Sequence, residues 1–223
     1  MKISIILIFL LILISPYSVF SQNKDFGIWY GLNGEHSLGK KLDIELSALV
    51  RTFSNASKVE QAFLEGGLSY NFNKWLTASG AYRFTENLEN NNEYHIRHKW
   101  LADIKGSGDI GNFGFSGRFR FQRQDKTYFE DANDEIPDYY GRVKIKTEYK
   151  TPSFTVNPGI SFETFSRMFE ATDKTIDKYR ISLGLVYKIN KKNSVELDYM
   201  YERDFLPRLI VMDLIYLTYS FKL

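Results

Sequence analysis

Apolar and polar residues alternate one by one along almost the whole chain from Leu42 onward. Within Leu42–Arg51, apolar side chains occupy every second position on one face, and Asp43, Glu45, Ser47 and Arg51 fall on the other. A period of two is the side-chain period of a β-strand with one apolar and one polar face. The pattern recurs in nine further segments: 64–72, 76–84, 94–104, 113–122, 142–149, 154–163, 179–189, 195–202 and 215–223. No stretch of comparable length has a helical period, so the sequence predicts an all-β fold.

The connections between these segments alternate between short turns and longer polar loops. The short turns lie near residues 71–74, 106–112, 150–153 and 190–193, and the longer loops at 54–58, 86–93, 125–138, 166–178 and 203–208. Short turns at one end and long loops at the other are typical of a meander of hairpins. We therefore predict an antiparallel up-and-down β-barrel of about 10–12 strands.

Counting 26–38 as a further strand gives an odd total of eleven candidates. Single-chain bacterial barrels have even numbers of strands. We therefore expect that 26–38 lies partly in the lumen or at the rim, or that the 125–138 loop contains one more strand.

The N-terminal 21 residues have the three-part layout of a secretory signal peptide. Met1 and Lys2 provide a positive start, residues 3–14 form an unbroken apolar run, and Ser21 precedes the expected cleavage before Gln22. The run is too short to span a bilayer comfortably. The predicted organisation is thus a signal peptide at 1–21 and a barrel domain at 22–223.

Composition excludes several classes of function. The chain has no cysteine, so disulfides, thiolate metal sites and a cysteine nucleophile are ruled out. Its 29 basic and 27 acidic residues leave a net charge of +2, which argues against a nucleic-acid partner. The glycines lie on predicted strands and not before helices, so no phosphate-binding loop and no cofactor are expected.

The aromatic content decides which face of the predicted barrel points outward. The chain contains 18 Phe, 15 Tyr and 3 Trp. About twenty of these rings fall on the apolar faces, and an eight-stranded interior is already nearly filled by ordinary side chains. A soluble barrel, which turns its apolar face inward, would be overfilled. The rings also cluster beside the turns and loops, as in the two aromatic girdles of a membrane barrel. The sequence predicts a transmembrane barrel with its apolar face toward lipid.

Two sequence regions resemble known proteins. The C-terminal residues Leu217, Tyr219, Phe221 and Leu223 alternate up to the last position, and this ending resembles the signal read by the outer-membrane assembly machinery. Further motifs lie at Asp25–Gly31, Leu68–Trp75, 81–84, 94–98 and 117–121. On these motifs the mature chain resembles the family catalogued as domain of unknown function 2490, a set of outer-membrane barrels. The resemblance implies location in the outer membrane of a Gram-negative bacterium, with outer-membrane lipid and the assembly machinery as partners, but no activity.

If the polar faces point inward, the lumen is lined by charges that separate by sign along the chain. The predicted basic lining consists of Arg97, Lys99, Arg118, Arg120, Arg142, Lys144 and Lys146. The predicted acidic lining consists of Asp43, Glu45, Glu65, Glu163, Glu196, Asp198 and Glu202. Two hypotheses follow. The charges pair and fill the lumen as part of a structural barrel, since buried charges must be compensated. Alternatively, they line a narrow channel for small anionic solutes.

Two other functions are weighed against these. A membrane-barrel hydrolase acting on lipid near the outer rim would need Ser, His and an acid to converge, with His95 or His98 beside Ser79 or Ser161. No spacing selects these residues, so no catalytic residue is predicted. A binding role for the surface loops is the remaining alternative. The acidic 125–138 loop lacks the ordered ligand spacing of a cation site, so no metal is predicted.

Overall fold

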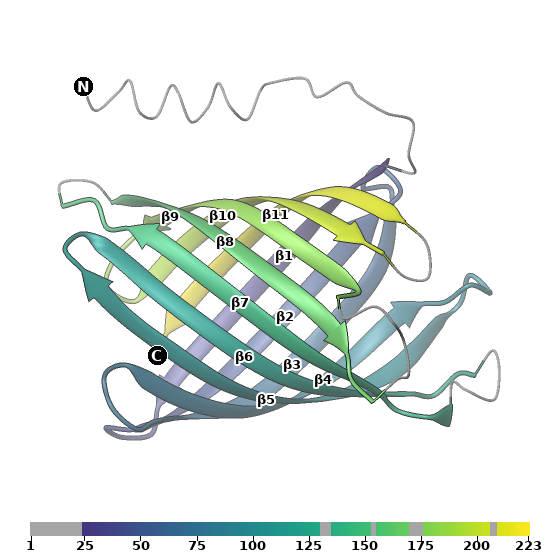
Figure 1. Cartoon of the computed structure of the whole chain (residues 1–223), viewed down its shortest axis with the longest axis horizontal. Coiled ribbons are helices and arrows are strands. Elements are labelled where there is room, and N and C mark those ends of the chain that lie inside the picture. The colour runs from purple at the N-terminus through teal and green to yellow at the C-terminus, as the bar shows by residue number, and fades with distance from the viewer. Residues whose placement is uncertain (1–23, 130–134, 153–154, 170–175, 206–208) are drawn as a thin grey trace.

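The computed structural model describes residues 24–129, 135–152, 155–169, 176–205 and 209–223, which form a closed β-barrel (Figure 1). Within these residues eleven strands follow one another around the wall in chain order. Their bounds are β1 (Lys24–Ser37), β2 (Leu42–Phe53), β3 (Lys58–Asn71), β4 (Leu76–Leu88), β5 (Tyr94–Ile110), β6 (Phe113–Lys126), β7 (Asp138–Tyr149), β8 (Val156–Arg167), β9 (Lys178–Lys188), β10 (Asn193–Asp204) and β11 (Ile210–Lys222).

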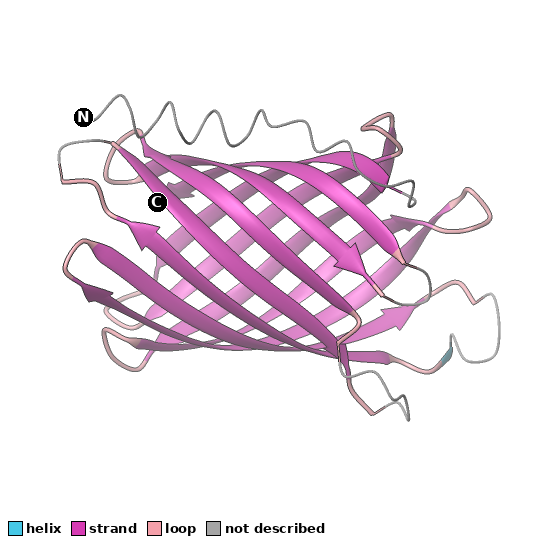
Figure 2. Ribbon diagram, turned by 45° about the horizontal axis from the view of Figure 1, so that its top comes forward, coloured by secondary structure: helices cyan, strands magenta, loops and turns pink. Residues whose placement is uncertain are grey.

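The strands are strongly tilted to the barrel axis, and the far wall crosses behind the near wall in Figure 2. The described residues of the connections at 54–57, 89–93, 127–137, 168–177 and 205–209 lie at one end, here called the loop end. The described residues of those at 38–41, 72–75, 111–112, 150–155 and 189–192 lie at the other, the turn end. None of the described residues belongs to a helix of the length and hydropathy that a membrane-spanning helix needs.

The alternation of side chains places the apolar face on the outside of the wall. Leu64 of β3 is 65% exposed and Ile145 of β7 is 58% exposed. Their polar neighbours point inward, and Arg83 of β4 and Glu163 of β8 are buried. The predicted sidedness, apolar outside and polar inside, is confirmed.

The barrel closes through a parallel pair, which differs from the purely antiparallel meander that the sequence predicted. β1 pairs with β11 in parallel from Lys24 opposite Val211 to Glu35 opposite Lys222, whereas the other neighbouring strands are antiparallel. When directions alternate around an odd number of strands, the first and last strands run the same way, so closure between them must be parallel. The expectation that 26–38 lies in the lumen or at the rim is wrong, because β1 is a full member of the wall.

Two predicted regions fall partly or wholly outside the described residues. The predicted signal peptide at 1–21 lies outside them, as do residues 130–134 of the acidic loop. The described flanks of that loop, 127–129 and 135–137, contain no strand.

The interior is not wholly polar, because an apolar cluster fills the space beside the closing strands. Trp29 of β1 packs with Met200, Met212 and Leu214, and its ring lies 5.9 Å from that of Tyr216 in an edge-on contact. A carboxylate secures the beginning of β1: the two side-chain oxygens of Asp25 accept hydrogen bonds from the backbone N–H groups of Ser54 and Asn55 in the loop after β2. Apolar packing thus holds β1 against β10 and β11, and a polar contact holds it to the loop after β2.

Candidate functional site

Three cavities follow one another inside the barrel from the turn end to the loop end. Their volumes are about 600 Å³ at the turn end, 330 Å³ in the middle and 270 Å³ at the loop end. The Arg83 side chain lines all three. The interior therefore contains a series of polar spaces with shared lining residues and is not a uniformly packed core.

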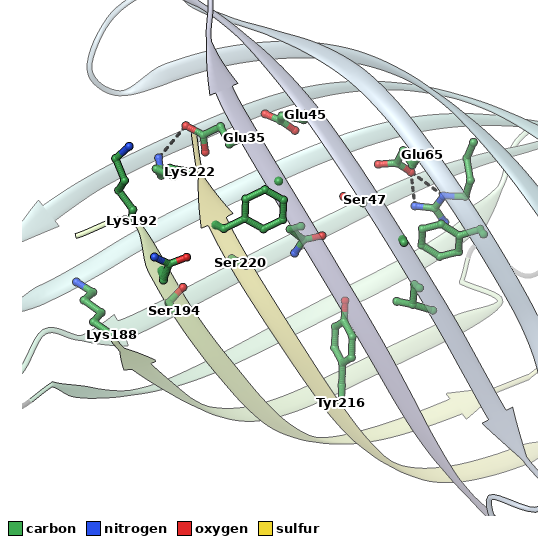
Figure 3. Close-up of a pocket in the computed structure, with 18 of the residues that line it drawn as sticks. Glu35, Glu45, Ser47, Glu65, Lys188, Lys192, Ser194, Tyr216, Ser220 and Lys222 are labelled. Atoms are coloured by element: carbon green, nitrogen blue, oxygen red, sulfur yellow. Dashed lines mark hydrogen bonds and ion pairs between the residues drawn. The ribbon is translucent and has the colours of Figure 1, made fainter. Parts of the chain in front are cut away.

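The turn-end cavity lies between β1, β2, β3 and the end of the chain (Figure 3). Here the Lys222 ammonium donates to a Glu35 carboxylate oxygen at 2.7 Å, which joins β11 to β1 across the parallel pair. Deeper in the cavity, the Arg83 guanidinium pairs with Glu65 at 2.6 Å. Glu45 also lines this space, and Figure 3 shows it beside Glu35.

The middle cavity is organised around one carboxylate, that of Glu163 on β8. Its Oε1 accepts hydrogen bonds from Arg118 at 2.7 Å and from Arg142 at 2.9 Å. Arg180 lies 4.0 Å from the other carboxylate oxygen. Glu163 is 5% exposed, so three guanidinium groups share one buried acid. Such an arrangement compensates the buried carboxylate but leaves the local net charge positive.

An ion pair also spans the interior between strands that are not neighbours. Lys146 of β7 donates to Glu196 of β10 at 2.5 Å, although β8 and β9 lie between them in the wall. Lys144 and Asp198 line the same middle cavity. Lys146 and Glu196 thus link two separate parts of the wall of the middle cavity.

Four arginines line both the middle and the loop-end cavities: Arg51, Arg83, Arg142 and Arg180. We call this set the arginine boundary. They come from β2, β4, β7 and β9, so cations approach the interior from well-separated parts of the wall. Any solute that passes from one cavity to the other passes beside guanidinium groups.

Inward-pointing aromatic rings hold these guanidinium groups. Arg51 lies 4.1 Å from the centre of the Trp29 ring, and Arg83 lies 3.8 Å from the centre of the Phe63 ring. Arg142 and Arg180 both lie over Phe165, at 4.3 and 4.6 Å. Cation–π stacking fixes a guanidinium by its face and leaves its N–H edge available to an anion.

The loop-end cavity has the most one-sided charge of the three. Eight cationic side chains and two acidic ones line it: Arg51, Arg83, Arg97, Lys99, Arg142, Arg167, Lys178, Arg180, Asp177 and Asp204. Gln122 and Gln124 add buried side-chain amides to the same wall.

The structure distributes the predicted lining residues over these spaces. Arg97, Lys99 and Arg142 line the loop-end cavity, Arg118 and Arg120 the middle and turn-end cavities, and Lys144 and Lys146 the middle one. Of the acids, Glu45 and Glu65 line the turn-end cavity and Glu163, Glu196 and Asp198 the middle one, while Glu202 is buried against Arg180. Asp43 lies near the turn end, where Ser37 and Asn71 donate to it.

Sequence reasoning missed part of this site. Arg51, Arg83 and Arg180 stand on predicted polar faces but were not assigned to the basic lining, and the rings of Trp29, Phe63 and Phe165 were not expected inside. A signal for Phe63 exists in the sequence, because it shares the parity of Gln61 and Glu65 on the inward face of β3.

The histidines form no catalytic arrangement within the described residues. His98 is hydrogen-bonded to the Tyr82 hydroxyl at 2.5 Å, and His95 stacks on Tyr128 and contacts Asn91. Ser161 is buried in the middle cavity on β8 and has no described contact with a histidine. Among the residues that the structure describes, no group of three His, Cys, Asp or Glu side chains could hold a metal ion.

The fold and interior define a closed, mostly antiparallel β-barrel with an apolar outer wall and an arginine-rich, charge-paired interior. The chain belongs to the DUF2490 family, whose description is "Protein of unknown function (DUF2490)" and whose model matches residues 26–208. The family resemblance predicted from the sequence is thereby confirmed.

Two solved structures are similar to the chain. One is an anion-selective porin from Comamonas acidovorans, with 12% identity and a TM-score of 0.38 over 73% of this chain and 48% of that chain. The chain thus spans about half the length of that porin. The other is a NanC porin in a rhombohedral crystal form, with 14% identity and a TM-score of 0.49 over 88% of this chain and 99% of that chain. No curated protein sequence matches the chain.

Proposed function

We propose that the chain forms a narrow outer-membrane channel for small anionic solutes. The observation that carries this proposal is the arginine boundary, where Arg51, Arg83, Arg142 and Arg180 line the junction of two interior cavities. Cations lining a pore raise the local concentration of anions and oppose the passage of cations.

The outer wall and the two predicted sequence signals support an outer-membrane location. Large apolar side chains such as Leu64, Ile104 and Ile145 are more than half exposed. A soluble protein rarely leaves so continuous an apolar surface in water, whereas a membrane barrel turns it to lipid. The predicted signal peptide at 1–21 and the C-terminal assembly signal agree with export to that membrane, with cleavage near Ser21 and Gln22.

Planar-bilayer recording tests the channel directly. We expect discrete current steps from the purified, folded protein under applied voltage. In a potassium chloride gradient, the reversal potential should have the sign of chloride selectivity. Silent bilayers, with folding verified by a mobility difference between unheated and boiled samples on a detergent gel, would overturn the channel. A reversal potential of the opposite sign would overturn its anion preference.

A second candidate is a structural barrel whose lumen is filled by ion pairs. The observation in its favour is the contact between Lys146 and Glu196, which crosses the interior between non-neighbouring strands. The same recording separates the two functions, because a filled barrel gives no current even when it is folded.

A further inference from the structure

Two cations of the loop-end cavity, the buried Lys99 and the partly buried Arg51, have no counter-ion among the described residues. Lys99 of β5 is 8% exposed, and within the described residues it makes no hydrogen bond or ion pair. Arg51 of β2 likewise forms no ion pair with a described residue, and its Nε is buried without a hydrogen-bond partner. Glu60 and Glu202 attract the Arg51 guanidinium only from beyond ion-pair contact.

The other six cations of this cavity are already paired. Arg97 pairs with Glu89 at 2.6 Å, Arg142 with Glu163 at 2.9 Å, and Arg167 with Asp177 at 3.8 Å. Arg83, Lys178 and Arg180 have acidic partners as well. Arg142 shares its acid with Arg118, so the local charge is positive there as well. Arg51 and Lys99 are the two cations of this cavity that have no ion-pair partner among the described residues.

An unpaired buried charge is strongly unfavourable, because it loses hydration without gaining a counter-charge. Lys99 also faces repulsion from Arg51, Arg83, Arg97 and Arg142. A solute that carried two negative charges into this cavity would relieve both penalties at once.

From this we infer that the loop-end cavity is a binding site for a small dianionic oxyanion, held between Arg51 and Lys99. The inference rests on the proposed function, since it names the class of anion that the same lumen would select. The cavity of about 270 Å³ has the volume of about nine water molecules, which suits a compact ligand.

The surrounding side chains suit such a ligand. Arg51 is fixed by its face against Trp29, so its N–H edge is available for paired hydrogen bonds to two oxygens of one anion. Lys99 supplies a point charge from β5, which is separated in the wall from β2, the strand of Arg51, by β3 and β4. Gln122, whose side-chain oxygen accepts from Arg142, adds a neutral amide to the lining.

Isothermal titration of the folded protein in detergent micelles with inorganic phosphate tests the site. At constant ionic strength in chloride, we expect saturable binding of one phosphate per chain. Lys99→Met and Arg51→Met each remove one charge and retain most of the side-chain volume. Each should weaken phosphate binding about tenfold to a hundredfold, as expected for the loss of a charged hydrogen bond.

Lys105→Met is the matched control. Lys105 is on the same strand as Lys99, but it lines a separate cavity at the turn end with Lys74 and Lys150. This variant should bind phosphate like the unaltered protein. The gel mobility of unheated samples verifies folding of all three variants, and Arg51→Met serves alone if Lys99→Met does not fold.

Three outcomes would overturn the inference. These are the absence of saturable binding by the folded protein, equal weakening by Lys105→Met and Lys99→Met, or binding of acetate as tight as that of phosphate. The titration does not depend on conduction. Phosphate binding without current in planar bilayers would support the binding site and overturn the channel. Current without saturable phosphate binding would support the channel and overturn the binding site.

Discussion

Lys146 and Glu196 are joined at 2.5 Å across the interior, from β7 to β10, with two strands of the wall between them. Both residues line the middle cavity, and their contact spans two intervening strands, whereas contacts between adjacent strands lie along the wall. On the proposed channel function, removal of this contact should therefore widen the lumen.

We expect Lys146→Met to raise the single-channel conductance and to change the stability little. Both side chains of the pair are 29% exposed, and pairs that water still reaches contribute about 1 kcal/mol or less. Planar-bilayer recording measures the first effect, and urea unfolding in micelles measures the second. Lys150→Met, which removes a contact with the exposed Asp109, should leave the conductance unchanged. Equal conductance in the two variants would contradict the prediction.

Glu163→Gln should strongly destabilise the barrel. The substitution retains the shape of the side chain but leaves Arg118, Arg142 and Arg180 without the carboxylate that they share. Breaking a buried ion pair from one side costs about 3–5 kcal/mol. Unfolding by guanidinium chloride in detergent micelles measures the loss in the free energy of unfolding. Glu45→Gln, at an exposed position with no ion pair among the described residues, should stay within about 0.5 kcal/mol of the unaltered protein. A similar loss in both variants would refute the role of Glu163.

Leu64→Arg tests whether the outer wall faces lipid. Leu64 is the seventh of fourteen residues of β3 and is 65% exposed. At the middle of a bilayer an arginine costs about 2–4 kcal/mol, whereas on a water-exposed surface it is nearly neutral. Ile110→Arg, at the turn end of β5, should cost about 1 kcal/mol or less. Unfolding from lipid vesicles compares the two variants, and a neutral Leu64→Arg would place this face in water.

Gly27→Ala should weaken the seam between the first and last strands. A Cβ at this position would lie 2.3 Å from the carbonyl oxygen of Thr52 and 2.9 Å from Leu214, and the backbone oxygen has little room to move. Overpacking of this kind costs about 1–3 kcal/mol. Gly117→Ala is the control, because its Cβ would meet no atom within 4 Å. Denaturation midpoints should separate the two variants, and equal midpoints would show that the seam tolerates the added methyl group.

The strands of this barrel are predictable from the sequence because their pattern is local. The ten predicted alternating segments and the further candidate 26–38 overlap the eleven observed strands, and parity places Leu64 outside and Glu163 inside. The parallel closure was not predicted, because the strand count was compared with the even numbers of other bacterial barrels. The position of β1 depends instead on its register against β11, which lies nearly two hundred residues away.

The site was predictable only in its chemistry. The sequence indicates which residues face the lumen, but not which of them meet at one level along the axis. That level depends on strand tilt and on the stagger of each register, which period-two patterning does not encode. The pattern therefore places Arg51, Arg83 and Arg180 on polar faces, but it does not predict that they line the same cavities.

The ion pair between Glu35 and Lys222 joins residues separated by 187 positions, and it lies in the strand pair that closes the barrel. Until these strands meet, both β1 and β11 present an unpaired backbone edge, which is unfavourable in lipid. Pairing strands that are so far apart in the sequence costs chain entropy, and contacts of this kind slow folding. We therefore expect the pairing of β1 with β11 to be the last step of folding. A chain that lacks β11 should form no stable, partly closed barrel.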